Sequence, residues 1–117
     1  MKLYFQGDVC IEAVDDMALK GAKAVPPARD GAVVLAEGEE SGHRHAFYSG
    51  GVSLLRAEAL ARDVPADLYI GHLRIDIDAA ELRHEEHASI TLPRGLYRVR
   101  RQREYAGSDA IGDLVVD

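Results

Sequence analysis

Short apolar runs, separated by turn-forming residues at intervals of about ten, constrain the fold of this chain most strongly. In the first of them, Asp8–Val14, apolar residues alternate with more polar ones, as in a strand with one buried face. Ala32–Glu37 is more uniformly apolar, which is typical of a strand buried on both faces. Helical periodicity is scarce. The pattern therefore predicts an all-β fold, a small barrel or sandwich with little helix.

The expected elements follow from these runs and from the breaks between them. Strands are expected at Asp8–Val14, Ala32–Glu37, His43–Tyr48, Val52–Arg56, Asp67–Ile77, Glu81–His84, Ser89–Leu92 and Leu96–Tyr105, with a short terminal strand at Ile111–Val116. Turns are expected at Gly38–Gly42, Gly50-Gly51 and Pro93-Arg94-Gly95. Asp15–Asp30 is expected to be a loop with one helical turn near Asp16–Lys20, and Ala57–Arg62 to be a short helix or a continuation of the strand before it.

Length and composition predict one ordinary globular domain. The chain has 117 residues, so we expect a single β domain over residues 1–117. Its one cysteine, Cys10, lies in an apolar stretch, and we expect it to be a small buried hydrophobic residue. No apolar run is long enough to cross a bilayer, and the N-terminus has no apolar signal region. We therefore expect a cytoplasmic protein with no membrane partner.

The segment Leu3–Gly7 reads Leu-Tyr-Phe-Gln-Gly, the core of a protease-cleavage site used in engineered proteins. Met1 and Lys2 do not complete that site. The residues that follow, from Asp8, lead directly into a predicted strand. We therefore interpret the segment as native.

Four of the five histidines form two close pairs. His43 and His45 are two apart in a predicted strand, where residues i and i+2 share one face. Both imidazoles can therefore reach one metal ion, while Arg44 points the other way. The fifth histidine, His72, lies on the apolar face of another predicted strand, and we expect it to pack there.

The second pair, His84 and His87, is three apart and faces one side only across a helical turn or a β-bulge. A bulge or tight turn at Glu85-Glu86 would let all four histidines converge. In a plain strand only one of the two would join, with Glu85 or Glu86 as an alternative carboxylate ligand. Convergence of the second pair is thus conditional on the local backbone.

Histidine clusters of this kind are typical of metal sites. Three or four imidazoles, with or without a carboxylate, suit zinc or non-haem iron, so we expect a divalent ion of one of these metals. Glu86 is the acid/base candidate beside a metal-bound water, and it could instead ligate the metal or orient a histidine. The alternative is a hydrogen-bonded polar cluster of His43, His45, Glu86 and an arginine, without metal.

Several motifs resemble those of a family of short, uncharacterised bacterial proteins. The resemblance is carried by Gln6-Gly7-Asp8-Val9, Gly42-His43-Arg44-His45, Leu82-Arg83-His84-Glu85-Glu86-His87, Ile90-Thr91-Leu92-Pro93-Arg94-Gly95-Leu96-Tyr97-Arg98-Val99 and Gln102-Arg103-Glu104-Tyr105. It covers most of the chain. It implies that the histidine pairs are family features, and it implies no activity.

A second resemblance is to cupins, whose first motif has a glycine, then His-X-His, then a glutamate a few residues later. Gly38 and His43-Arg44-His45 are similar to the beginning of that motif. No glutamate occurs in Ala46–Ser49, and Pro93-Arg94-Gly95, which is similar to the Pro-X-Gly of the second motif, follows the histidines. The resemblance implies a metal-binding barrel similar to a cupin.

The last predicted strand is rich in arginine. Five arginines lie between Arg94 and Glu104, whereas the whole chain has a net charge of −6, which argues against a general nucleic-acid binder. Guanidinium groups suit carboxylate or phosphate, so Arg101 and Arg103 are the candidates for an anion site. The alternative is that the arginines pair with the domain's own carboxylates or form a solvated edge.

Three functions compete on this sequence. The first is a small metal-binding β protein with His43, His45, His84 and His87 as ligands, an unassigned reaction and a small-molecule ligand. The second is a non-catalytic binding or accessory module in which the histidine cluster only braces the fold. The third is recognition of an anion or nucleic acid by the Arg94–Arg103 strand. Edge strands in a small β protein also favour a homodimer.

Overall fold

In a computed structural model that describes residues 2–38 and 41–102, the chain is almost entirely β. The elements are β1 (Leu3–Gln6), β2 (Val9–Val14), β3 (Lys23–Ala24), β4 (Val33–Glu37), β5 (Arg44–Phe47), β6 (Val52–Arg56), the short 3₁₀ turn η1 (Glu58–Leu60), β7 (Tyr69–Arg83) and β8 (Ile90–Arg101). The all-β prediction is confirmed. No described helix is long and apolar enough to cross a membrane.

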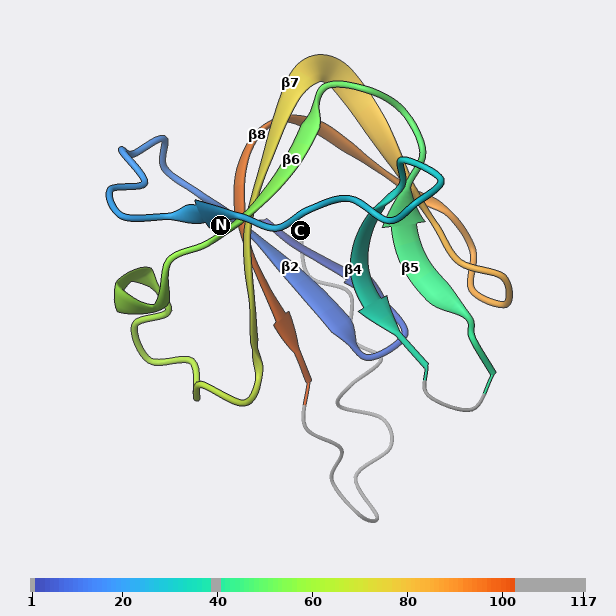
Figure 1. Ribbon diagram of the computed structural model, residues 1–117, viewed down its shortest axis with the longest axis horizontal. Coiled ribbons are helices and arrows are strands. Elements are labelled where there is room, and N and C mark those ends of the chain that lie inside the picture. The colour runs from blue at the N-terminus through green and yellow to red at the C-terminus, as the bar shows by residue number, and fades with distance from the viewer. Residues whose placement is uncertain (1, 39–40, 103–117) are drawn as a thin grey trace.

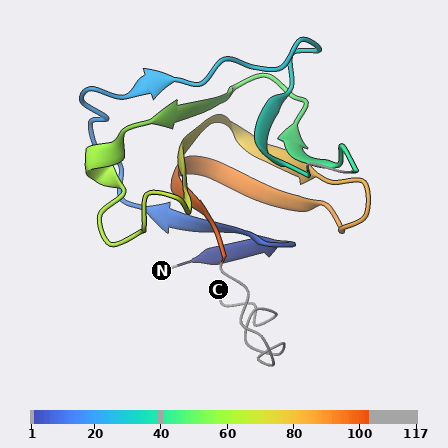
Figure 2. The same ribbon diagram turned by 60° about the horizontal axis from the view of Figure 1, so that its bottom comes forward.

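β7 and β8 form a long antiparallel hairpin at the centre of the sheet (Figure 1). On its outer side β8 pairs with β2, and β2 pairs with β1. On the other side the sheet forks, because the first half of β7 pairs with β6 and its last residues pair with β5. β3 extends one branch and β4 extends the other. Figure 2 shows β4 and β5 at the same end of the molecule as the β7–β8 loop.

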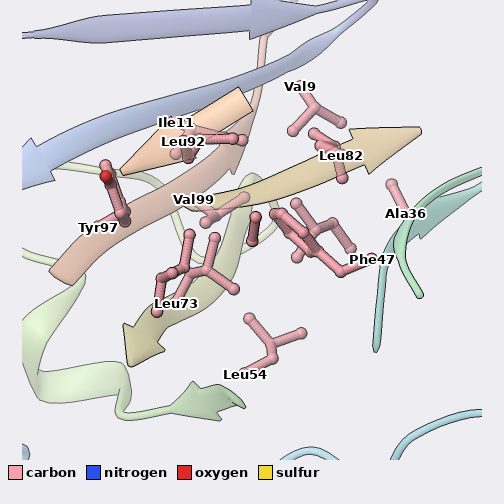
Figure 3. Packing of buried hydrophobic residues seen from close by; sticks show 13 residues of the cluster. Val9, Ile11, Ala36, Phe47, Leu54, Leu73, Leu82, Leu92, Tyr97 and Val99 are labelled. Carbon is pink, nitrogen blue, oxygen red and sulfur yellow. The ribbon is translucent and has the colours of Figure 1, made fainter. Parts of the chain in front are cut away.

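One hydrophobic core joins these strands. It takes side chains from β2, β4, β5, β6, β7 and β8, and Phe47, Leu73 and Val99 within it are fully buried. Figure 3 shows these side chains gathered between the strands. Burial of this apolar surface is the main stabilising contribution to the fold. His45 in β5 lies two residues before Phe47 of the core, and His84 lies two residues after Leu82 of the core.

Two expected breaks in the chain do not occur. Pro93-Arg94-Gly95 is not a turn but part of β8, and Asp67–Ile77 and Glu81–His84 are not separate strands but one strand, β7. The register between β7 and β8 shifts between Ile75 and Ala79, opposite Pro93–Gly95. The turn-forming residues therefore mark an irregularity within a continuous hairpin, which a bulge accommodates without ending either strand.

Other differences concern short elements. Leu3–Gln6 forms β1 and Lys23–Ala24 forms β3, although neither was expected as a strand. Asp16–Lys20 forms no helical turn. For Ala57–Arg62 the helical alternative is confirmed, as η1. The end of the expected Leu96–Tyr105 strand and the expected strand at Ile111–Val116 lie outside the described residues.

Candidate metal centre

Four histidine side chains converge where β5 begins and where β7 connects to β8. The ring centroids of His45 and His84 are 4.4 Å apart, and those of His84 and His87 are 4.6 Å apart. The ring of His43 is 5.7 Å from that of His84, and the rings of His45 and His87 are 6.0 Å apart. All four predicted ligand candidates therefore lie in one cluster.

Local backbone geometry brings the two pairs together. His43 precedes β5 and His45 lies within it, so the two-residue spacing directs both side chains to one side. The β7–β8 connection turns tightly, because the Nδ1 of His84 accepts hydrogen bonds from the backbone N–H groups of Glu86 and His87, at 3.0 and 3.2 Å. The turn at Glu85-Glu86, on which convergence depended, is therefore present.

Gln6 determines which ring nitrogen of His45 carries the proton. The Gln6 side-chain amide donates to the carbonyl oxygens of Leu82 and Ala88, both at 3.0 Å, so its Oε1 faces the other way as an acceptor. That oxygen lies 2.8 Å from the Nδ1 of His45, which must therefore carry the ring proton. Nε2 of His45 keeps its lone pair. An outer partner that fixes the tautomer in this way is typical of metal-ligating histidines.

Burial reinforces the neutral state of His45. It lowers the pKa of the ring from 6.5 to about 4, and the nearby ring of His84 acts in the same direction. The carboxylate of Asp8, whose Oδ1 is 3.7 Å from His45 Nε2, opposes this shift without reversing it. At neutral pH, His45 therefore does not hold a second proton that a metal ion would have to displace.

Glu86 acts on His43 as Gln6 acts on His45. Its Oε1 lies 2.7 Å from the Nδ1 of His43. A carboxylate only accepts hydrogen bonds, so His43 Nδ1 carries a proton and a neutral ring leaves the lone pair on Nε2. The glutamate side chain is largely exposed. In this arrangement Glu86 orients a histidine, one of the three roles that the sequence left open.

In His84 the roles of the two ring nitrogens are reversed. Its Nδ1 accepts two backbone N–H groups, so a neutral ring carries its proton on Nε2. His84 thus closes the turn in this conformation and becomes a ligand only if it releases those amides. Its neighbour Glu85 adds a carboxylate, and His43, His84 and Glu85 offer ligand atoms that all lie within 4.8 Å of one another. Glu85 remains a candidate carboxylate ligand.

A pocket of about 260 Å³ contains the four histidines and Glu86. Arg101 from the end of β8 and Asp8 from the β1–β2 turn form another part of its wall. Nη1 of Arg101 is 3.1 Å from Oδ2 of Asp8, and the other oxygen of Asp8 faces His45. The cluster is therefore open to a small ligand.

The β1–β2 turn leaves room for the imidazoles only because residue 7 is glycine. Gly7 has a φ of +58°, which favours glycine. A Cβ atom placed there would lie 2.8 Å from His87 Nε2 and 3.2 Å from His45 Cε1. The turn thus forms one side of the cluster.

Gln6 and Asp8 are site residues that sequence reasoning missed. Both belong to the Gln6-Gly7-Asp8-Val9 motif, which carried the family resemblance but suggested no role. The signal was a conspicuous Gln-Gly-Asp beside an otherwise apolar strand. Nothing local connects it with His45, because Gln6 and His45 are 39 residues apart.

The remaining predicted residues lie elsewhere. His72 is buried on β7, with its Nδ1 2.8 Å from the hydroxyl of Tyr69, and is not part of the cluster. Two arginines of the β8 region are paired with acidic residues, Arg98 with Glu12 and Arg94 with Asp78. These pairs, like that of Arg101, favour the alternative in which the domain's own carboxylates engage the arginines. Arg103, the second anion-site candidate, lies outside the described residues.

The comparisons with known proteins identify a family. A protein family described as "Domain of unknown function (DUF8820)" matches residues 5–102 of the chain. The chain belongs to this family. No curated protein and no solved structure matches it. The resemblance to cupins therefore stays a prediction.

Proposed function

We propose that this protein binds one divalent metal ion, zinc or iron(II), through its histidine cluster. His43 and His45 are the principal ligands, Glu85 and His87 are further candidates, and His84 joins them if it releases the amides of the β7–β8 turn. Such a set of imidazoles with one carboxylate or water suits either metal. The ion would act as a Lewis acid on a ligand that enters the pocket.

One observation carries the proposal: two imidazoles have their protons held on Nδ1, and among the described residues no hydrogen bond uses the Nε2 atom of either ring. Gln6 holds the proton of His45 on Nδ1, and Glu86 does the same for His43. A cluster that served only to brace the fold would be expected to use both nitrogens of each ring in internal hydrogen bonds. Outer partners that accept the Nδ1 proton are instead what a metal-ligating histidine needs.

The openness of the pocket favours a site that binds a further ligand over a closed structural site. The side chain of His43 is 33% exposed, and the pocket is bounded by charged groups of Asp8 and Arg101. A structural zinc site has four protein ligands and no open position, whereas a reactive one keeps a position for water or substrate. Because Glu86 accepts the Nδ1 proton of His43, we propose it as a positioning residue rather than as the acid or base.

The test is a metal titration of protein without a histidine tag, treated first with a chelator. Zinc affinity is measured by competition with a chromophoric chelator, and cobalt is substituted to report coordination from its visible spectrum. We expect one equivalent to bind, and His45→Ala to weaken zinc binding by roughly a hundredfold or more. A cobalt spectrum typical of an open site would support a further ligand.

His72→Gln is the matched control, because it removes a buried histidine outside the cluster. It should leave zinc affinity unchanged, provided that circular dichroism shows a folded chain. The proposal fails if the wild-type protein binds no zinc, or if His72→Gln weakens binding as much as His45→Ala does.

A further inference from the structure

A second pocket, of about 350 Å³, lies beside the histidine pocket. Its walls are mostly apolar and come from the two branches of the forked sheet and the segments next to them. The lining residues are Val25, Val34, Leu35, Leu54, Arg56, Asp67, Tyr69, Ile70 and Arg101. Pockets of this size with apolar walls and a few polar groups are typical sites for small molecules.

The two pockets are neighbours along β4 and share one side chain. Val34 and Leu35 line the apolar pocket, and the next two residues, Ala36 and Glu37, line the histidine pocket. Arg101 lines both. A single molecule can therefore occupy the apolar pocket and reach past Arg101 toward the imidazoles.

Two arginines line the apolar pocket, and they favour an anionic head group. Arg56 is held by the backbone carbonyls of Tyr69 and Ile70 and is close to Glu58. Nη1 of Arg101 donates a hydrogen bond to Oδ2 of Asp8, at 3.1 Å. A guanidinium has five N–H donors in a fork that matches a carboxylate, so Arg101 can bind one while keeping Asp8. Asp67 adds one carboxylate to the lining of this pocket.

From this arrangement we infer that the protein binds an organic acid with an apolar body. The body lies between β4 and β6, and the carboxylate lies on Arg101, facing the histidine cluster. The inference deepens the proposed function, and rests on it for the approach of the head group to the metal. The pocket and Arg101 belong to the chain without metal, so this part can be tested alone.

The test is isothermal titration calorimetry of the full chain, after chelator treatment, with octanoate as the probe. Acetate has the same head group without the body, and 1-octanol has the body without the charge. We expect octanoate to bind at least roughly tenfold more tightly than either of them. Equal affinity for acetate would exclude the apolar pocket, and equal affinity for 1-octanol would exclude Arg101; either result overturns the inference.

Variants locate the probe. Arg101→Gln should weaken octanoate binding about tenfold, while Arg100→Gln on the opposite face of β8 serves as the matched control and should not. Val34→Trp should fill the pocket and abolish octanoate binding, with Val25→Trp as the second variant should the first fail to fold. Octanoate binding that survives both pocket-filling variants overturns the inference.

The two proposals fail separately. If zinc binds to the histidines and octanoate does not bind, the metal site stands and the organic-acid site falls. If octanoate binds at Arg101 and zinc does not bind, the pocket stands without a metal. In the expected case, adding one equivalent of zinc tightens octanoate binding, because the head group gains a second cationic partner.

Discussion

Two regions of the molecule each hold a buried histidine, and the two rings are bonded with opposite polarity. His45 is 6% exposed and His72 is 2% exposed. The Nδ1 of His45 donates to Gln6, which leaves a lone pair on Nε2. Tyr69 accepts the backbone N–H of Ala57 and therefore directs its own hydrogen to the Nδ1 of His72. Gln6 accepts a hydrogen bond from His45 Nδ1, which leaves Nε2 as a potential ligand atom, whereas Tyr69 donates to the lone pair of His72 Nδ1.

Burial alone therefore does not distinguish a candidate metal ligand, His45, from a structural histidine, His72. Both rings are kept uncharged by burial, which lowers the pKa of each. What differs is the direction of one hydrogen bond. The variants below should therefore separate metal affinity from stability.

Gly7→Ala should have the largest effect. An L-residue at a positive φ costs about 1–2 kcal/mol, and the new Cβ would also displace the rings of His87 and His45. We expect both the free energy of unfolding and the zinc affinity to fall, measured by chemical denaturation and by chelator competition. Gly21→Ala is the matched control, since Gly21 also has a positive φ but no atom within 4 Å of the added Cβ. Equal results for the two variants would contradict the close approach of Gly7 to the cluster.

Gln6→Leu should be the next largest. It removes the acceptor that holds the proton of His45 on Nδ1, and removing such a partner typically costs 10–100-fold in metal affinity, so we expect a loss in roughly that range. It also removes the two bonds to the β7–β8 region, so stability should fall as well. Unchanged zinc affinity in a folded Gln6→Leu protein would show that His45 is not a ligand.

Tyr69→Phe should affect stability alone. Without the hydroxyl, the buried Nδ1 of His72 and the backbone N–H of Ala57 lose their partner, which costs about 1–3 kcal/mol. Denaturant unfolding should report this loss while the zinc titration stays at the wild-type value. A parallel loss of zinc affinity would mean that the two regions are coupled.

Glu86→Gln should have a smaller effect on metal affinity than Gln6→Leu. The carboxylate is 70% exposed, so water can replace its bond to His43 at little cost. We expect zinc affinity to fall by less than about tenfold. Glu81→Gln, at an exposed site on β7, is the control and should be neutral. A Glu86→Gln protein that has lost all zinc binding would instead indicate direct ligation by Glu86.

The smallest effect concerns pH. Burial, then Arg98 and Arg62, lower the pKa of His72 below its ordinary value of 6.5. Below that pH the unfolded chain takes up a proton that folded His72 does not, so the free energy of unfolding falls as the pH falls from about 6.5. In chelator-treated protein, His72→Gln should show a shallower decline than wild type, because His45 acts with the same sign in both. Identical slopes would contradict the assigned pKa direction.

Sequence patterns predicted the strands well wherever apolar and polar residues alternate within one segment. They failed at Pro93–Gly95, because turn residues are also tolerated at an irregularity in a long bent hairpin. The patterns also missed β1, which pairs with β2 so that Gly7 lies in a tight turn between the two strands. Both cases depend on which strand lies opposite, and one stretch of sequence does not contain that information.

The sequence predicted the histidines and Glu86 of the candidate site but not Gln6 and Asp8. The two-residue spacing identified His43 and His45, and the Glu85-Glu86 turn joined His84 and His87 to them. The role of Gln6 as the partner of His45 was not predictable, since the two residues are 39 apart, whereas the sequence did offer Glu86 as a residue that orients a histidine. The sequence also treats His84 as equivalent to His45, although His84 holds a turn together.

The hydrogen bonds from the Gln6 side chain to Leu82 and Ala88 have a consequence for the order of folding. Gln6 is 76 residues from Leu82 and 82 residues from Ala88, so its bonds close most of the length of the chain. The β7–β8 hairpin closes a short loop and is entropically favoured to form early, whereas contacts as distant as these come late. We therefore expect the lone pair of His45 to be fixed only in the last steps of folding. A metal ion bound there would act mainly on the rate of unfolding and little on the rate of folding.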